Sequence, residues 1–412
     1  MLFLPRAGSF VQPSLIRSED PLRTLTELFS SPMPSFPLLP PSTIGILGGG
    51  QLGRMLALEA RRSGYRVVIF TDEPQGCPAG QFADLEINAA YDDRAALDRF
   101  LTEVDVVTAE FENIPDACLQ AVEAVKPLRP GRRAIYTTQH REREKLFLRE
   151  KGIACAEFRI VETLAELEKA VGELGRPCVI KTAAFGYDGK GQAKVVEETD
   201  LAEAWKAFEG HHAVVEQWVP FLCEVSVVGA RSVDGRMAMH GVVENQHAHH
   251  ILDVTLAPAR VDAAIVEQAL ELWEAVAEGL DYVGTMAVEL FVTAEGRVLV
   301  NEIAPRPHNS GHYTIDACVT NQFQQQLRAI CGLTLGDPSQ HSPAVMVNLL
   351  GDVWPSELVH PDWSPVLDHP RAHLHLYGKA SARPKRKMGH YTVLGDSLEE
   401  ALVSVEQIRR SF

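Results

Sequence analysis

Short apolar runs alternate with amphipathic stretches over residues 43–138. The runs at 43–47, 66–70 and 105–108 predict strands, and the residues from Gln51 to Ser63 have the apolar spacing of a helix that ends before Gly64. Strands that alternate with helices are typical of a parallel sheet. The pattern therefore predicts a parallel α/β domain over residues 43–138.

The next region, residues 139–335, has a less regular order of elements. We predict a charged helix over 141–151, strands at 178–181, 213–216 and 224–228, and a long helix over 261–280. This order predicts an α+β nucleotide-binding domain. Apolar runs at 344–347 and 373–377 predict strands of a smaller, β-rich C-terminal domain over residues 336–412.

A predicted hairpin in the second region brings acidic residues together. Glu289 lies in an apolar run that ends at Val292, residues 294–296 (AEG) predict a turn, and a second apolar run follows. Folding about the turn places Glu289 opposite Asn301 and Glu302, and such oxygen ligands bind magnesium. A hairpin with solvated acids is the alternative, but the flanking runs are apolar and unpaired buried carboxylates are costly. The hairpin thus predicts a magnesium-nucleotide clamp.

Residues 1–42 are rich in Pro and Ser, and we predict that they form a disordered tail. A weak amphipathic helix near residues 22–29 is an alternative, whereas Glu19, Asp20 and Glu27 disfavour a transit peptide. We expect ordered structure to begin at Thr43. A chain that starts at Met33 should be as active and as stable as the full chain.

Composition excludes several classes of function. The 412-residue chain is 46% hydrophobic and carries a formal net charge of −16, which would repel nucleic acids and anionic membranes. Its seven cysteines form no Cys-x-x-Cys pair, which is typical of reduced thiols and disfavours structural zinc. No run has the length of a membrane helix, and the N-terminus is too short for a signal-peptide core. We expect a soluble cytoplasmic protein.

Two glycine-rich segments indicate phosphate binding. Residues 48–53 (GGGQLG) follow a predicted strand and open a helix, with Asp72 further along, so a dinucleotide-binding oxidoreductase is one interpretation. Residues 186–192 (GYDGKGQ) follow the strand that carries Lys181. A flexible glycine loop with a strand lysine neutralises a triphosphate without the geometry of a P-loop. A tight hairpin needs fewer glycines, and the second segment therefore favours ATP.

Two further segments carry weaker signals. Residues 216–219 (EQWV) end a strand and lead to Glu224, an arrangement that fits adenosine but equally an ordinary strand end. His247, His249 and His250 lack the carboxylate or cysteine partners of a metal site, and a hydrogen-bonding role is the better hypothesis for His247. Residues 370–394 contain no acid but several Lys and Arg, which predicts an anion site, with a solvated basic loop as the alternative.

Taken together, these motifs resemble the ATP-grasp superfamily and, within it, the 5-(carboxyamino)imidazole ribonucleotide synthase family of purine biosynthesis. The resemblance covers about residues 43–390. It rests on GGGQLGRM at 48–55, TAEFE at 108–112, GYDGKGQ at 186–192, NEIAPRPHNSGH at 301–312 and GKASARPKRKMGH at 378–390. A formate-using relative, glycinamide ribonucleotide transformylase, is the alternative, but there we would expect Asp-Thr-Gly in place of Asn309-Ser-Gly311.

The resemblance implies an ATP-grasp fold with an N-terminal pre-ATP-grasp domain, and it implies roles for individual residues. ATP would contact Arg141, Lys181, Gly186, Tyr187, Asp188, Gly189, Lys190, Gly191, Gln192, Glu216, Gln217, Trp218, Val219, Glu224, His247, Asn301 and Glu302. Magnesium, with manganese as a substitute, would bind Glu289 and Glu302. The catalytic residues would be Lys181, Asp188, Lys190 and Arg306. The aminoimidazole ribonucleotide would contact Gln51, Glu110 or Glu112, Tyr187, Lys379 and Arg386.

The same resemblance implies a reaction. Bicarbonate would attack the γ-phosphate of ATP to give carboxyphosphate, and the ribonucleotide amine would capture the carboxyl group or released carbon dioxide. A homodimer would be expected. One departure lies at Gln324 and Gln326, where this family usually has an acid and a histidine.

Overall fold

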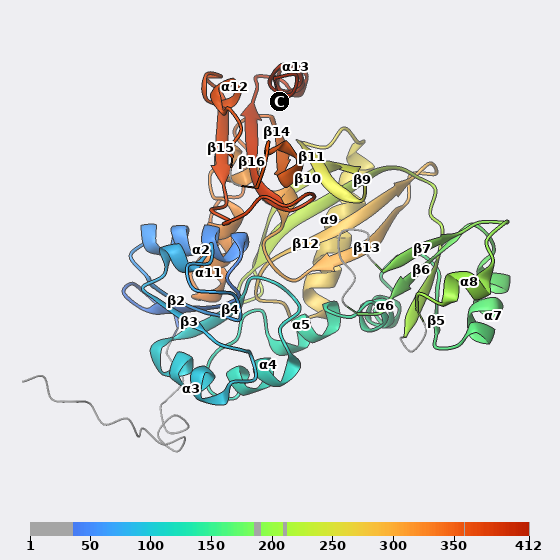
Figure 1. The fold of residues 1–412 in the computed structure, drawn as a ribbon, viewed down its shortest axis with the longest axis horizontal. Helices are drawn as coiled ribbons and strands as arrows, with labels where there is room; N and C mark the ends of the chain where they lie inside the picture. Colours follow the sequence, from blue (N-terminus) through green and yellow to red (C-terminus); the bar gives the residue numbers. More distant parts are fainter. Residues whose placement is uncertain (1–35, 185–190, 209–211, 358, 412) are drawn as a thin grey trace, which may run out of the picture. The chain divides into compact units, whose positions relative to one another are not determined.

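The computed structural model describes residues 36–184, 191–208, 212–357 and 359–411 (Figure 1). The predicted weak helix near residues 22–29 and most of the second glycine-rich segment lie outside the described residues.

The first sheet is parallel, as the alternating pattern predicted. Its strand order is β3-β2-β1-β4, and its strands are β1 (Thr43–Leu47), β2 (Arg66–Thr71), β3 (Leu85–Asn88) and β4 (Val106–Ala109). Alternate residues of a strand face opposite sides. Val67 and Ile69 therefore pack under α2 (Gln51–Arg62), whereas Val68 and Phe70 pack on the face covered by α3 (Arg94–Glu103), α4 (Asp116–Glu123) and α5 (Arg132–Thr138).

The second sheet is small and antiparallel. Its order is β5-β8-β6-β7, and its strands are β5 (Phe158–Val161), β6 (Cys178–Thr182), β7 (Gln192–Val195) and β8 (Ala213–Gln217). Helices α7 (Leu164–Leu174) and α8 (Leu201–Trp205) pack on it, and α6 (Arg141–Glu150) precedes it. A capping box at Thr163 and Glu166 fixes the start of α7.

The third sheet has eight antiparallel strands in the order β13-β12-β9-β10-β11-β14-β16-β15. The strands are β9 (Phe221–Arg231), β10 (Met237–Ala248), β11 (Ile251–Ala257), β12 (Gly284–Thr293), β13 (Val298–Ala304), β14 (Ala344–Leu350), β15 (Ala372–Leu376) and β16 (Lys387–Leu394). The last three come from the region expected to form a separate C-terminal domain. They continue the sheet of the nucleotide-binding region, through the pairing of β11 with β14.

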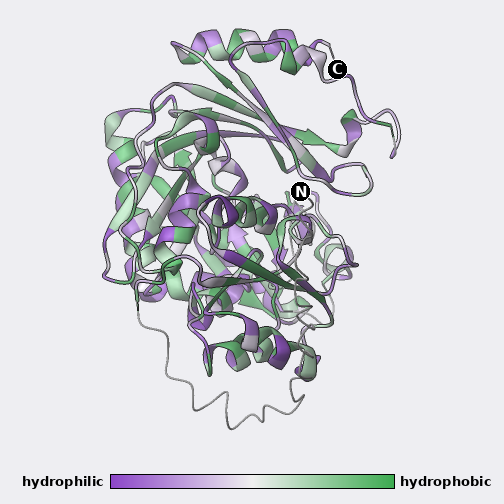
Figure 2. Ribbon diagram, turned by 90° about the vertical axis from the view of Figure 1, so that its left-hand side faces the viewer, coloured by the Kyte–Doolittle hydropathy of each residue, from purple (hydrophilic) through white to green (hydrophobic). Residues whose placement is uncertain are grey.

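Several helices cover the large sheet. Helix α9 (Ala263–Gly279) buries Trp273 completely against β9 and β12. Helix α13 (Leu398–Arg409) packs apolar residues against β14 and β16 and leaves polar ones outside, an alternation visible in Figure 2. The short helices are η1 (Gly80–Phe82), η2 (Asn309–Gly311), α10 (Thr314–Ala317), η3 (Gly351–Val353) and α12 (Ser364–Leu367).

Helix α11 (Gln322–Ile330) joins the first sheet to the third. It contacts α2 on one side and β9 and β12 on the other, and Gln326 bridges the two sheets: its Nε2 donates to Thr108 Oγ1 at 2.9 Å, while its Oε1 accepts from Thr285 N at 2.5 Å. Gln324 forms a capping box with Asn321 and donates to Glu59 at 3.2 Å. Both glutamines that depart from the family pattern thus make hydrogen bonds between regions, Gln326 to a hydroxyl and a backbone amide and Gln324 to the carboxylate of Glu59.

Ordered structure begins before Thr43, which corrects the expected boundary of the tail. Leu38 is only 6% exposed, and its amide donates to Cys331 O at 2.8 Å. The ring of Phe36 lies under the guanidinium of Arg129 at 3.7 Å and against Gly332. Residues 36–42 contain enough apolar surface to dock on the end of α11, which their proline-rich composition concealed.

Candidate active site

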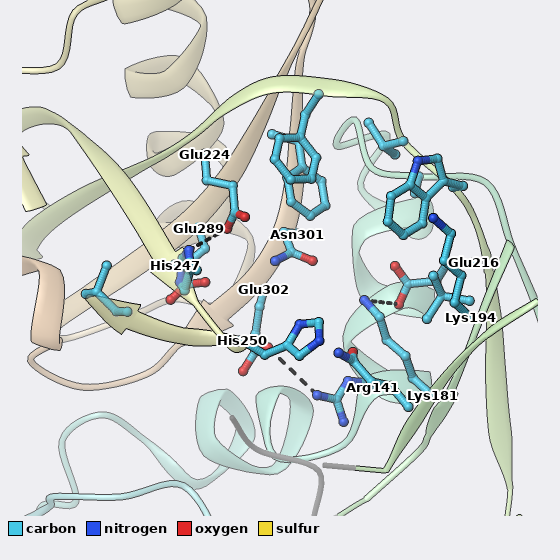
Figure 3. A pocket seen from close by; sticks show the side chains of 18 of the residues that line it. Arg141, Lys181, Lys194, Glu216, Glu224, His247, His250, Glu289, Asn301 and Glu302 are labelled. Atoms are coloured by element: carbon cyan, nitrogen blue, oxygen red, sulfur yellow. Dashed lines mark ion pairs between the residues drawn. The ribbon is translucent and has the colours of Figure 1, made fainter. Parts of the chain in front are cut away.

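A cavity of about 560 Å³ is lined by residues of both the small sheet and the large sheet. Figure 3 shows Lys181, Lys194 and Glu216 from the small sheet facing Glu224, Glu289, Asn301 and Glu302 from the large one. Arg141, from the start of α6, reaches the same space.

The predicted hairpin is confirmed. Strands β12 and β13 pair with Glu289 directly opposite Glu302, and the register shifts next to this pair, so Asn301 is an extra, bulged residue. The turn includes Gly296 in a left-handed conformation, with φ of 74°. Since residues 289, 301 and 302 all line the cavity, the bulge brings two carboxylates and one amide to a single place.

The two clamp carboxylates have unequal partners. Glu289 Oε1 lies 3.0 Å from His308 Nε2, whereas Glu302 meets the guanidinium of Arg141 at 3.9 Å and accepts no hydrogen bond from the described residues. Burial and the nearby carboxylate of Glu289 raise the pKa of Glu302, although Arg141 opposes the shift. For Glu289, burial is outweighed by His308 and the pKa falls. The charge of Glu302 is therefore less well compensated than that of Glu289, and the carboxylate oxygens of the pair fit magnesium as ligands.

Lys181 faces the clamp from the small sheet. Its Nζ lies 3.1 Å from Glu216 Oε1, and Lys145 lies 3.5 Å from the other oxygen of the same carboxylate. Burial favours the neutral acid, but the two lysines outweigh it and lower the pKa of Glu216 to about 2. Glu216, which we expected near adenosine, uses its side chain to hold lysines. Any contact with adenosine is left to the backbone.

One wall of the cavity is apolar and aromatic. The rings of Phe221 and Phe291 stack with their centroids 4.7 Å apart, and Lys194 Nζ lies 3.8 Å from the ring centre of Trp218. Val219 lines the same wall. A flat, apolar slot with polar groups at its edges is the usual environment of a planar base.

His247 has the hydrogen-bonding role that we expected. Its Nδ1 lies 3.0 Å from Glu224 Oε2, and although burial lowers the pKa of the imidazole, Glu224 outweighs this and raises it. His249 and His250 occupy the tight turn between β10 and β11 with positive φ.

The first glycine-rich segment is already occupied by a side chain. Glu110, at the end of β4, accepts hydrogen bonds from the amides of Gly50 and, at 2.9 Å, Gly53. A Cβ at Gly48 would lie 2.4 Å from Glu110 Cγ, so the glycines are needed for this close approach. The carboxylate takes the position in which a dinucleotide fold binds pyrophosphate. The dinucleotide interpretation is therefore wrong.

Glu112 is also committed to a partner. Arg306 Nε donates to Glu112 Oε2 at 2.6 Å, and Nη2 donates to Oε1 at 3.3 Å. Burial opposes ionisation, but this two-bond pair outweighs it and lowers the pKa of Glu112. Both residues line the cavity beside the clamp.

The basic C-terminal motif lies against the first glycine-rich region. The carbonyl of Gly378 accepts from Gln81 Nε2 at 3.0 Å, Lys379 Nζ donates to Lys387 O at 2.6 Å, and Arg386 donates to Ser381 O at 3.0 Å. Burial, together with Arg386, lowers the pKa of Lys379 to about 8, while Glu110 opposes the shift. Lys387 lines the large cavity, so this motif borders that cavity.

The structure brings most expected site residues together. Those that line the cavity are Glu112, Arg141, Lys181, Gln192, Glu216, Gln217, Trp218, Val219, Glu224, His247, Glu289, Asn301, Glu302 and Arg306. Gln51, Glu110, Gly191, Lys379 and Arg386 are not part of that lining. Gly186, Tyr187, Asp188, Gly189 and Lys190 lie outside the described residues.

Sequence reasoning missed several residues of the cavity. Lys194, His308 and Lys387 line it, and Lys145 lies behind it with its side chain 1% exposed. His308 and Lys387 lie inside the motifs at 301–312 and 378–390, and this position could have indicated their place in the cavity. Lys145 lies in a helix in which most residues are charged, and nothing local distinguishes it.

Other features of the described chain add no cofactor site. All seven cysteines are free. Asp316, His375 and His390 lie close enough to share an ion, but Asp316 and His375 already form a 2.9 Å hydrogen bond. Over the described ranges, no helix combines the length and apolar character needed to cross a membrane.

The chain matches protein families over three successive stretches. These are the ribonucleotide synthetase preATP-grasp domain at residues 42–139, the ATP-grasp domain at 146–323 and the phosphoribosylaminoimidazole carboxylase C-terminal domain at 344–404.

Similar proteins match this chain over nearly their whole length. The N5-carboxyaminoimidazole ribonucleotide synthase of Bacillus subtilis (strain 168) is 43% identical, over 88% of this chain and 94% of the relative. That of Brucella melitensis biotype 1 is 44% identical, over 86% and 97%.

Solved structures agree. An ADP complex of N5-carboxyaminoimidazole ribonucleotide synthetase is 43% identical, with a TM-score of 0.85 over 90% of this chain and 97% of that one. The Aspergillus clavatus synthase in complex with ADP and 5-aminoimidazole ribonucleotide is 32% identical, with a TM-score of 0.80 over 90% and 99%.

Proposed function

The chain belongs to the N5-carboxyaminoimidazole ribonucleotide synthase family of ATP-grasp enzymes, and from this membership we propose how its residues carry out the reaction. It is an ATP-using ligase of purine biosynthesis that makes N5-carboxyaminoimidazole ribonucleotide. The observation that carries the proposal is the meeting, in one cavity, of the acidic hairpin with Lys181 and Arg141.

We place ATP between the two sheets. The adenine would lie in the apolar slot formed by Trp218, Phe221 and Phe291, with Glu224 close to the ribose. Lys181 and Arg141 would bind phosphate oxygens, because both are cations that face the clamp. The motif of the second glycine-rich segment supports further phosphate contacts from residues 186–192, with Asp188 and Lys190 near the transferred group.

Magnesium fits the oxygen set of Glu289, Asn301 and Glu302. Glu302 accepts no hydrogen bond from the described part of the chain, and the carboxylate of Glu289 beside it makes its negative charge unfavourable without a cation. When bound, the ion would neutralise charge on the β- and γ-phosphates. Manganese would be an acceptable substitute.

The remaining residues would bind and orient the other two substrates. We propose that Lys379 and Arg386 bind the phosphate of 5-aminoimidazole ribonucleotide, with Gln51, Tyr187 and the 108–112 segment near its base. Arg306, held by Glu112, faces the cavity beside the clamp and would orient bicarbonate. The fixed guanidinium suits a planar anion with two acceptor oxygens.

The reaction then needs positioning more than a covalent nucleophile. A bicarbonate oxygen attacks the γ-phosphorus, the bond to the β-phosphate oxygen breaks, and ADP leaves with carboxyphosphate remaining. The ribonucleotide amine next attacks the carboxyl carbon, directly or as released carbon dioxide, and phosphate leaves as the amine loses a proton. We further propose that the enzyme works in the cytoplasm as a homodimer, which sedimentation at micromolar concentration would test.

The direct test uses ¹³C-bicarbonate with ATP, Mg²⁺ and 5-aminoimidazole ribonucleotide. We expect ADP release to require both the ribonucleotide and bicarbonate, and the label to appear on the ribonucleotide in equal amount to ADP. Equal ADP release with formate and glycinamide ribonucleotide in their place would favour the transformylase. ADP release that ignores the ribonucleotide would refute the proposed site.

A further inference from the structure

One face of α6 supports the edge of the large sheet at the clamp. Strand β13 is the outermost strand of that sheet, so one side of its backbone has no neighbouring strand. At Val300 this side is paired, since Val300 N donates to Ala154 O at 2.8 Å. Beyond that point, side chains of α6 replace a strand. Lys145 Nζ donates to Asn301 O at 3.0 Å, and Glu144 Oε2 accepts from Ile303 N at 3.0 Å.

These bonds hold the clamp from both sides. Asn301 is the bulged residue and Ile303 follows Glu302, so the supporting bonds flank the expected magnesium ligand. Arg141, Glu144 and Lys145 are spaced at i, i+3 and i+4 and therefore share one helix face. The geometry that displays Glu302 to the cavity depends on this face.

Lys145 also reaches the opposite jaw of the cavity. Its Nζ lies 3.5 Å from Glu216 Oε2, on β8 of the small sheet, while Glu216 Oε1 contacts Lys181 at 3.1 Å. The side chains of Lys145 and Glu216 are 1% and 5% exposed, whereas Lys181 is more open at 15% and lines the cavity. Lys145 thus bonds to β8 and to β13 at once without facing the cavity.

We propose that Lys145 is a positioning residue for the phosphate end of the ATP site, which aligns the two sheets and shares the carboxylate of Glu216 with Lys181. This inference rests on the proposed phosphate role of Lys181. With Lys145 present, the carboxylate of Glu216 interacts with two lysines, so neither lysine experiences its full attraction. Without Lys145, Lys181 is the remaining lysine near the buried carboxylate of Glu216. Lys181 then binds Glu216 more tightly and the phosphates of ATP less tightly.

A purely structural buried ion pair predicts something different. Removing one partner of such a pair destabilises the protein, because a buried charge loses compensation. It would not by itself change the apparent KM for ATP in the folded enzyme. The two hypotheses therefore predict different KM values for ATP, and a double-mutant cycle with Glu216 distinguishes them most clearly.

The experiment compares Lys145→Met, Glu216→Gln and the double variant, with Lys151→Met at the end of the same helix as the matched control. We expect Lys145→Met to raise the KM for ATP about tenfold and to leave the KM for the ribonucleotide within about twofold. In the Glu216→Gln background, the added Lys145→Met change should raise the KM for ATP less than about twofold, because no carboxylate remains to withdraw Lys181.

The outcomes divide cleanly. A destabilised Lys145→Met enzyme with an unchanged KM for ATP would overturn the proposal, as would equal effects of Lys145→Met with and without Glu216. If Lys145→Met does not fold, a rise of more than about twofold in the KM for ATP from Glu216→Gln to the double variant, which removes both buried charges, would still overturn the proposal. Lys181→Met is run alongside: if it leaves ATP use unchanged, the proposed phosphate site is wrong, and if it alone raises the KM, only the positioning role fails.

Discussion

The clamp gathers negatively charged side chains, and the basic C-terminal motif gathers positively charged ones. In the clamp, burial and the charge of Glu289 raise the pKa of Glu302. In the basic motif, burial and the charge of Arg386 lower the pKa of Lys379 to about 8. In each cluster the protein gathers charges that repel each other, a condition typical of ligand sites. The clamp is suited to a cation and the basic motif to an anion.

The two clusters differ in how the protein tolerates them before ligands bind. The cations of the basic motif donate to backbone carbonyls, as Lys379 does to Lys387 O and Arg386 to Ser381 O. Glu302, in contrast, accepts no hydrogen bond within the described structure, and its side chain is 51% exposed to the cavity. The clamp should therefore depend on its ligand more strongly than the basic motif does.

The largest expected effect is at the clamp. Glu302→Gln should keep the fold and lower turnover on the order of a thousandfold, because a metal ligand is lost and the triphosphate charge is poorly compensated. Steady-state ADP release over a magnesium titration measures this. Glu295→Gln, in the exposed turn of the same hairpin, is the matched control and should be nearly silent. Near-normal turnover with a normal magnesium dependence would remove Glu302 from the site.

A substitution in the basic motif should have a smaller effect, and it should change only the KM for the ribonucleotide. Arg386→Ala should raise the KM for 5-aminoimidazole ribonucleotide roughly thirtyfold, since a charge-assisted phosphate contact contributes about 2 kcal/mol. The KM for ATP should change little, because Lys181 and magnesium serve its phosphates. Arg383→Ala, an exposed arginine of the same motif, is the control. Weakened ATP use with an unchanged ribonucleotide KM would show that the two clusters have been assigned the wrong ligands.

The pH dependence of the KM for the ribonucleotide tests the positive charge of the basic motif. Lys379 is a cation below about pH 8 and becomes neutral above it, so affinity for the ribonucleotide phosphate should fall as pH rises through 8. The substrate phosphate stays dianionic over this range. We expect its KM to rise about tenfold between pH 7 and 9 in the wild type. Lys379→Arg should flatten that rise, because arginine stays charged. An identical profile in the variant would assign the titration to another group.

The smallest effect concerns a buried carboxylate that belongs to neither cluster. Glu110 accepts from two glycine amides, so Glu110→Gln should lower the free energy of unfolding by roughly 1 to 2 kcal/mol, since an amide places its own donors near those of the backbone. Urea denaturation would measure it. Glu302→Gln should show no such loss, because Glu302 accepts no comparable bonds. Equal losses in both variants would erase the distinction between structural and ligand-binding acids.

Local pattern was enough to predict the elements that carry the chemistry. The hairpin register followed from the spacing of Glu289, the turn and Asn301, and helix α2 followed from apolar spacing that ends before Gly64. The parallel direction of the first sheet also followed from alternation of strands and helices, although its edge strand β3 was not predicted.

The remaining features depend on contacts between distant segments. Glu110 reaches glycines about 60 residues earlier in the chain, and Lys145 meets Asn301 across a sequence separation of 156. No local pattern in either segment indicates such a partner. Strand β10 was not predicted because its polar residues and Gly241 interrupt the apolar pattern. Its pairing with β9 and β11 holds it in the sheet. Residues 36–42 were assigned to the tail because their proline content outweighed the two apolar side chains that dock, Phe36 and Leu38.

We infer that Glu289 and Glu302 together hold the divalent ion of the nucleotide. A crystal grown with ADP and Mn²⁺, with anomalous diffraction measured above the manganese edge, tests it most directly. We expect one strong anomalous peak within about 2.5 Å of an oxygen of Glu289 and of an oxygen of Glu302, bridged to the phosphates of ADP. A nucleotide bound in the cavity with its manganese away from both carboxylates would contradict the account.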